Sequence, residues 1–198
     1  MKNLLPYCIC ILLLQPLFVY SQDKNITIRI GQDKSIALRE YESQATLSPK
    51  SFKIQVLFEN VAGVYCYASF SDSIYKLGEQ DPIPGFANLP NMTMAEEKFN
   101  DEKELLISKN GWSYWFYDPA IDWHRFNRKI ILLDNGRLVA TKSIKQLYII
   151  DEKKELKLKD NTTPLYLFFV AVSETDTDGK PAKELLRRKI KIDWTNDD

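Results

Sequence analysis

The chain has 198 residues, with 27 Lys and Arg against 27 Asp and Glu, so its formal net charge is zero. Zero net charge argues against binding to nucleic acid through a bulk positive field. A hydrophobic content of 44% with 12% aromatic residues argues against intrinsic disorder. The single histidine excludes sites built from several imidazoles, and we predict no cofactor and no metal site.

The first 21 residues have the features of a secretory signal peptide. Lys2 precedes an apolar run over 4–20, and Ser21 provides a small residue for cleavage. The alternative is an uncleaved anchor, but the uninterrupted apolar core at 7–14 is shorter than the roughly 20 residues of a spanning helix. We therefore predict cleavage after Ser21 and export to the periplasm, the cell surface or the extracellular medium, as in a bacterial envelope protein.

The mature chain, 22–198, is predicted to be a single domain without a disulfide or a transmembrane segment. Cys66 is the one cysteine left after cleavage, so the domain must be stabilised by its core. The same-face neighbours of Cys66 are apolar, which predicts a buried and inert thiol. No linker rich in Gly, Ser or Pro divides this region.

Alternation of apolar and polar residues with period two dominates the mature chain, which predicts strands with one buried face. The Asn-Gly and Asp-Gly pairs at 110–111, 135–136 and 178–179 are typical of tight hairpins. They predict pairing of 104–108 with 112–117, of 129–133 with 137–141, and of 165–173 with 185–193. The other predicted strands are 26–30, 36–38, 52–58, 64–70, 144–150 and 155–159.

This pattern favours an all-β fold. With about 9–12 short strands, the closest match is an antiparallel β-sandwich, immunoglobulin-like or jelly-roll-like. A Thr-x-x-Glu capping box predicts one short helix over 94–100, which follows a long Pro-containing loop at 71–91. The basic residues within 183–191 alternate with apolar ones, which we interpret as an exposed strand edge protected by charge.

Seven aromatic residues between Trp112 and Phe126 form the densest feature of the sequence. In a strand over 112–117, aromatic side chains would occupy both faces. Large aromatics usually lie in cores, so we favour a strand buried on both faces. If one face is exposed, it suits sugar rings, peptides or proteins. The candidate ligand-binding residues are then Trp112, Tyr114, Trp115, Tyr117, Trp123 and His124.

Enzymatic activity is not expected from the motifs present. His124 lies two positions from Asp122, but no Gly-x-Ser-x-Gly elbow provides a nucleophile. The acidic residues within 96–104 are interleaved with lysines and indicate a solvated face, and 174–179 fits a hairpin tip better than a calcium loop.

The expected function is therefore that of an exported, non-enzymatic module that binds a protein, a peptide or a glycan. Its surface would come from the aromatic stretch 112–126 and the loop 71–91. Two alternatives stay open. One is a structural subunit of an envelope or surface assembly, and the other is a glycan-acting hydrolase that uses Asp118 and Asp122.

Overall fold

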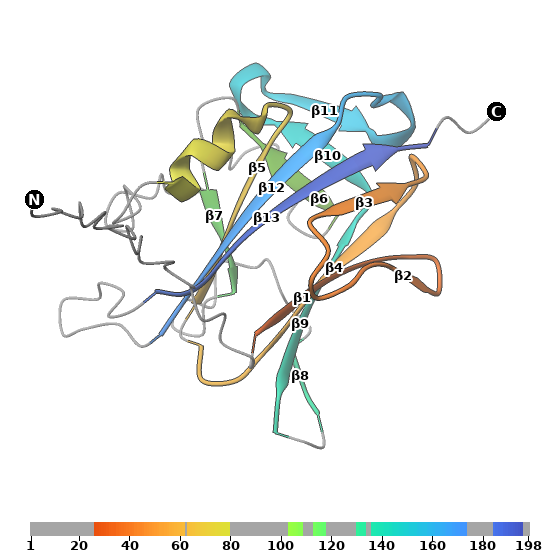
Figure 1. Cartoon of the computed structure of the whole chain (residues 1–198). Helices are drawn as coiled ribbons and strands as arrows, with labels where there is room; N and C mark the ends of the chain where they lie inside the picture. The colour runs from red at the N-terminus through yellow and green to blue at the C-terminus, as the bar shows by residue number, and fades with distance from the viewer. Residues whose placement is uncertain are drawn as a thin grey trace, which may run out of the picture.

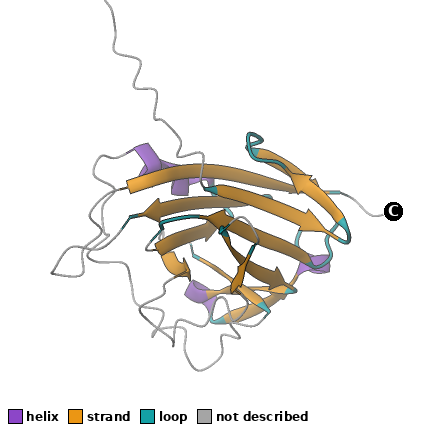
Figure 2. Cartoon of the chain, turned by 90° about the horizontal axis from the view of Figure 1, so that it is seen from below, coloured by secondary structure: helices purple, strands orange, loops and turns teal. Residues whose placement is uncertain are grey.

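The computed structural model describes residues 26–61, 63–79, 103–108, 113–117, 130–133, 136–173 and 184–195. These residues are mostly in strands, and their helical segments are short 3₁₀ turns (Figures 1 and 2). The predicted β-rich class is thus confirmed. The predicted helix at 94–100 lies outside the described residues.

The first sheet has five strands in the order β2-β1-β4-β9-β8, and every neighbouring pair is antiparallel. The predicted hairpin of 129–133 with 137–141 is confirmed, because Ile131 pairs with Val139. Gly136 adopts a φ of 80°, the left-handed conformation that glycine favours and that this turn requires. The strands are β1 (Thr27–Gln32), β2 (Ser35–Leu38), β4 (Phe52–Phe58), β8 (Ile130–Leu132) and β9 (Leu138–Ile144).

The second sheet also has five strands, in the order β3-β13-β12-β5-β7. The predicted hairpin of 165–173 with 185–193 is confirmed as the antiparallel pair β12 and β13. β13 pairs on its other side with β3 in parallel, but only over Lys191–Trp194. The residues 184–190 are at the edge of the described sheet, yet each is buried or half-buried, so the exposed edge of the sequence interpretation is wrong. The strands are β3 (Gln44–Leu47), β5 (Gly63–Ser69), β7 (Ser113–Tyr117), β12 (Leu165–Val172) and β13 (Glu184–Trp194).

A third sheet, β11-β10-β6, shows that one predicted hairpin is wrong. β6 (Glu104–Ile107) pairs in parallel with β10 (Gln146–Ile149), whereas β7 pairs with β5. All four residues of β6 are buried, and a strand buried on both faces suits parallel pairing in the interior better than an exposed hairpin. β11 (Lys154–Lys157) completes this sheet, between the 3₁₀ turns η4 (Ile150–Glu152) and η5 (Leu158–Asp160).

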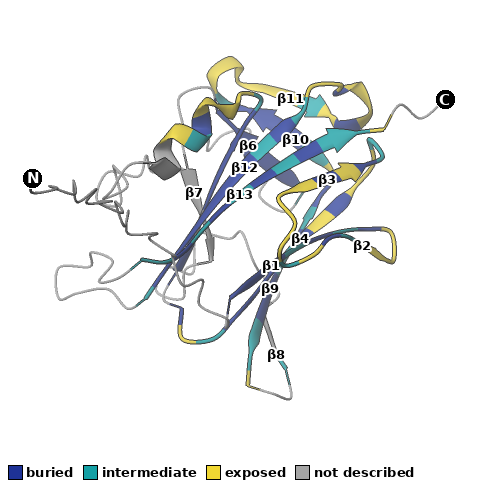
Figure 3. Cartoon of the chain, viewed as in Figure 1, coloured by how far each residue is buried: buried dark blue, intermediate teal, exposed yellow. Residues whose placement is uncertain are grey.

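One hydrophobic core includes residues from all three sheets. Phe52 and Phe58 of β4 pack in the same cluster as Phe169 of β12 and Leu105 of β6. Cys66 of β5 is also fully buried there, so its predicted position is confirmed. The buried strands and exposed loops are visible in Figure 3. In β12 and β13 this core covers one face only, and we call the opposite face of the second sheet its outer face.

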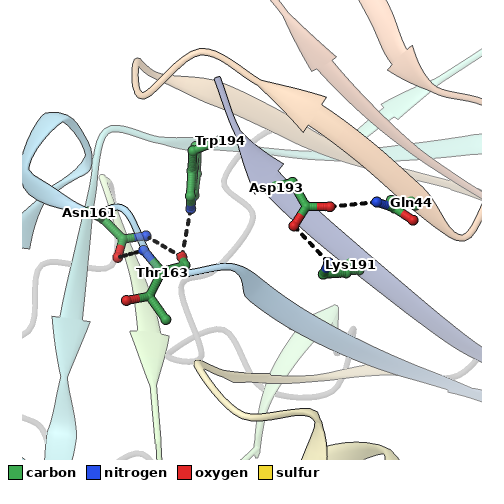
Figure 4. Close-up of polar contacts among 6 residues, drawn as sticks. All are labelled: Gln44, Asn161, Thr163, Lys191, Asp193 and Trp194. Atoms are coloured by element: carbon green, nitrogen blue, oxygen red, sulfur yellow. Dashed lines mark hydrogen bonds and ion pairs between the residues drawn. The ribbon is translucent and has the colours of Figure 1, made fainter. Parts of the chain in front are cut away.

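Polar contacts fix the carboxyl-terminal part of β13 to its neighbours (Figure 4). Asp193 accepts a hydrogen bond from the Gln44 side chain of β3 at 2.5 Å and forms an ion pair with Lys191 at 2.8 Å. The indole Nε1 of Trp194 donates to the Thr163 carbonyl at 2.8 Å. Side chains thus reinforce the parallel β3–β13 pairing, which is only four residues long.

Candidate functional site

Three of the six predicted binding residues lie on β7, the strand at one edge of the second sheet. Trp115 pairs in register with Tyr65 of β5, and Ser113 pairs with Tyr67. Tyr114 and Tyr117 lie on the same strand. The remaining predicted residues lie outside the described ones: Trp112, Trp123 and His124, and the Asp118 and Asp122 of the hydrolase alternative.

The second predicted surface segment, 71–91, begins with a helix instead of an open loop. The 3₁₀ helix η1 (Asp72–Glu79) starts where the Ser71 hydroxyl accepts a hydrogen bond from the Ser73 amide at 3.2 Å. This serine cap is a helix-start signal that the sequence prediction missed. Residues 80–91 lie outside the described part of the chain.

η1 packs on the outer face of the second sheet, across β12 and β5. Ile74 is buried there in a second cluster with Phe168 and Val170 of β12 and Tyr67 of β5. β5 therefore contacts η1 on its face and β7 along its edge. The described beginnings of the two predicted surface segments thus meet at one strand.

Aromatic rings continue from η1 across the outer face. The rings of Tyr75 and Tyr166 meet edge to face with centroids 5.6 Å apart, and those of Tyr67 and Phe168 are also 5.6 Å apart. The Lys189 ammonium lies 5.4 Å from the Tyr75 ring centroid, within range of a cation–π interaction. This row of rings connects η1 to β13.

Burial raises the pKa of the Tyr75 hydroxyl well above its usual range, and the nearby Tyr166 and Asp72 add to the shift. The hydroxyl oxygen is inaccessible to solvent and has no hydrogen-bond partner among the described residues. A buried hydroxyl without a partner lowers stability, and one that resists ionisation lowers it further at alkaline pH.

We expect Tyr75→Phe to leave the free energy of unfolding unchanged or to raise it by up to about 1 kcal/mol near neutral pH. Because the folded-state pKa is raised, the wild type loses stability as the pH rises above about 10, where the unfolded tyrosine ionises first. The variant should lack this part of the alkaline loss. Urea denaturation across the alkaline range measures both effects.

Tyr41→Phe is the matched control, because Tyr41 is 88% exposed. It should follow the wild type at every pH. A loss of more than about 1 kcal/mol in Tyr75→Phe at neutral pH would show that the hydroxyl makes a favourable hydrogen bond.

A groove of about 360 Å³ lies between β13 and the segment 39–43 that links β2 to β3. We call it the 39–43 groove. Phe168 lies beneath it and is fully buried, whereas Tyr41 at its rim is 88% exposed. The residues that line it are Glu40, Tyr41, Glu42, Ser43, Phe168, Arg187, Arg188 and Lys189.

Arg188 holds the segment 39–43 against both sheets. Its guanidinium donates to the carbonyls of Arg39 at 2.7 Å and Glu42 at 2.9 Å, and to the carbonyl of Ile28 on β1 at 2.9 Å. Arg188 is only 8% exposed. Burial lowers its pKa, and the Glu40 and Glu42 carboxylates oppose that shift. A buried cation that satisfies three carbonyls fixes the backbone around Tyr41.

The sequence interpretation placed all the basic residues of 183–191 on an exposed edge and therefore missed Arg188. The overlooked signal is the position of Arg188 in the alternation of buried and exposed residues along β13. Arg188 has the same parity as Leu186, Ile190 and Ile192, which all face the core. A charged residue in a core-facing position needs a hydrogen-bonding partner, which here is the crossing segment 39–43.

The described residues contain neither a metal site nor a membrane-spanning helix. Among them, no group of three or more His, Cys, Asp or Glu side chains could hold a metal ion. The described part of the chain also has no helix with the length and apolar character needed to cross a membrane. Comparisons with protein-family models, curated proteins and solved structures find no match for this chain.

Proposed function

We propose that this protein is an exported, non-enzymatic binding module for a protein, a peptide or a glycan. One observation carries the proposal, namely that β5 contacts both η1 and β7. These are the described beginnings of 71–91 and 112–126, the two segments that the sequence indicates as a binding surface. A surface built from two segments on one strand has the fixed support that a binding site needs.

Export and the finer fold are part of the same proposal. The basic and apolar character of 1–21 supports a cleaved signal peptide and a location in the periplasm, at the cell surface or outside the cell. A β-sandwich of immunoglobulin-like or jelly-roll-like arrangement in one domain, 22–198, is supported by two five-stranded sheets that share one core.

A role as a structural subunit of an envelope or surface assembly is the second candidate. One observation favours it: Ile36 on β2, the edge strand of the first sheet, is 55% exposed. An apolar side chain on an edge strand suits addition of a strand from another chain.

Tryptophan quenching tests the proposed surface on protein recovered after export from a Gram-negative host, where its first residue should be Gln22. Trp194→Phe removes the one tryptophan that lies outside the stretch 112–126 and leaves Trp112, Trp115 and Trp123 to report. We expect iodide to quench their emission, because a binding face must be accessible. On peptide and glycan arrays, Trp115→Ala should weaken binding by about tenfold or more.

Ile36→Ala is the control for the arrays, because Ile36 is 55% exposed and lies on β2 in the other five-stranded sheet. It should not change binding at β7. Emission that resists iodide, or a protein that binds neither array, would reject the aromatic surface. A Trp115→Ala variant that loses several kcal/mol of stability would support the buried interpretation instead.

A further inference from the structure

The 39–43 groove has walls of opposite charge. Glu40 and Glu42 lie on the segment 39–43, and Arg187 and Lys189 lie on the outer face of β13. The carboxylates would repel an anionic ligand, and the guanidinium and ammonium groups would repel a cationic one. Such walls favour a neutral ligand that both donates and accepts hydrogen bonds.

Each carboxylate of this wall is held at one oxygen. One Glu42 oxygen accepts from the Arg39 amide at 2.7 Å, and one Glu40 oxygen accepts from the Thr27 hydroxyl at 3.2 Å. Each contact fixes its carboxylate and leaves the second oxygen without a partner among the described residues. Planar groups held in this way can bind adjacent hydroxyls on one ligand.

Three backbone carbonyls of the segment 39–43 are already occupied, which argues against an extended peptide as the ligand. Arg188 binds the carbonyls of Arg39 and Glu42, and the Lys191 amide donates to the Ser43 carbonyl at 2.8 Å. A peptide that adds to a sheet edge needs unoccupied carbonyls and amides along that edge. Recognition at this groove must therefore come from side chains.

Tyr41 provides an apolar face at the rim. Its side chain is 88% exposed, although the backbone on both sides is fixed by Arg188. An exposed ring on a rigid segment can stack against a flat ligand face at small entropic cost. The groove volume, about 360 Å³, is near the lower end of the range for small-molecule sites, about 300–1,000 Å³.

From these observations we propose that the 39–43 groove binds a neutral saccharide. Sugar hydroxyls donate and accept from adjacent carbons, which matches the carboxylate and cationic walls, and the C–H face of a pyranose ring matches Tyr41. The site goes beyond the surface at β7 and does not depend on it, because none of its lining residues belongs to β7, β5 or η1.

Calorimetric titration with neutral tetrasaccharides tests this site. The probes are cellotetraose, maltotetraose, mannotetraose and chitotetraose, each added to the purified protein. We expect at least one to bind, and Tyr41→Ala to weaken its binding by about tenfold. Glu42→Gln should weaken it less, because the amide oxygen can still accept from the Arg39 amide.

Two variants serve as controls. Ile36→Ala changes another exposed apolar residue outside the groove lining, so it should bind the probe as the wild type does. Lys53→Ala changes an exposed charged residue on β4 outside the groove lining, so it should also bind the probe normally. An unchanged urea midpoint in Tyr41→Ala shows that any lost binding is not lost folding.

The proposal is overturned if none of the four tetrasaccharides binds at about 10 mM, well above the weakest affinity expected of a specific site. Equal binding by the wild type and Tyr41→Ala also overturns it. So does tighter binding of oligogalacturonate or of a decapeptide than of any neutral probe, because the groove would then select charge or backbone.

Discussion

Replacing Arg188 with methionine is expected to lower the free energy of unfolding by about 3 kcal/mol. Methionine fills a similar volume but cannot donate the three hydrogen bonds to the carbonyls of Ile28, Arg39 and Glu42. Each bond from a charged donor contributes about 1.5–3 kcal/mol, and the cost of burying the guanidinium offsets part of the sum. Urea denaturation followed by circular dichroism measures the change.

Arg187→Met is the matched control for this prediction. Arg187 is adjacent in sequence but lies on the outer face, where its half-buried side chain pairs with Glu184. Its replacement should cost less than about 1 kcal/mol. If the two variants are equally stable, the hydrogen bonds from Arg188 to the carbonyls of Arg39 and Glu42 do not stabilise the fold.

The second large loss of stability is expected at the adjacent residues Phe168 and Phe169. Both are fully buried, but Phe169 faces the main core and Phe168 lies in the outer cluster beneath η1. Phe→Ala at either position should cost about 3–5 kcal/mol, because each leaves a cavity in a packed cluster. Thermal and urea unfolding of the two single variants measure this.

The outcome at Phe168 determines whether η1 is part of the folded unit. A loss below about 1 kcal/mol at Phe168, with the full loss at Phe169, would show that η1 covers the outer face only loosely. Ile36→Ala is again the control, because Ile36 is 55% exposed and its truncation creates no buried cavity.

Local patterns were sufficient to predict most of the strands and two of the three hairpins. The alternation in β13 is strong because one face of this strand contacts the main core, and β12 is recognisable as a continuous apolar run. Turn residues such as Gly136 fixed the hairpin of β8 with β9. Both signals arise from neighbours along the chain, so a single sequence contains them.

Pairings between distant segments could not be predicted in this way. β3 is a four-residue strand whose partner, β13, lies far along the chain, as the contact between Gln44 and Asp193 across 149 positions shows. The parallel pair β6 and β10 is also distant. No turn signal specifies such pairings, because the hydrophobic core selects them after the chain collapses.

The same difference between local and distant contacts explains which candidate site was predicted. The aromatic stretch that includes Trp115 was found because its residues are contiguous in sequence. The 39–43 groove was missed because it exists only where the segment before β3 meets β13. In sequence, Tyr41 is a single tyrosine between two glutamates. Only the structure shows that the buried Arg188 fixes the backbone on both sides of it.

The place of β13 next to the edge strand has a consequence for the order of folding. β13 lies between β3 and β12, so β3 has no partner in the second sheet until β13 joins it. Such high contact order makes folding slow, because the entropy of closing long loops is lost before long-range contacts form. The edge strand β3, formed early in the chain, therefore joins the sheet only as late as β13 does.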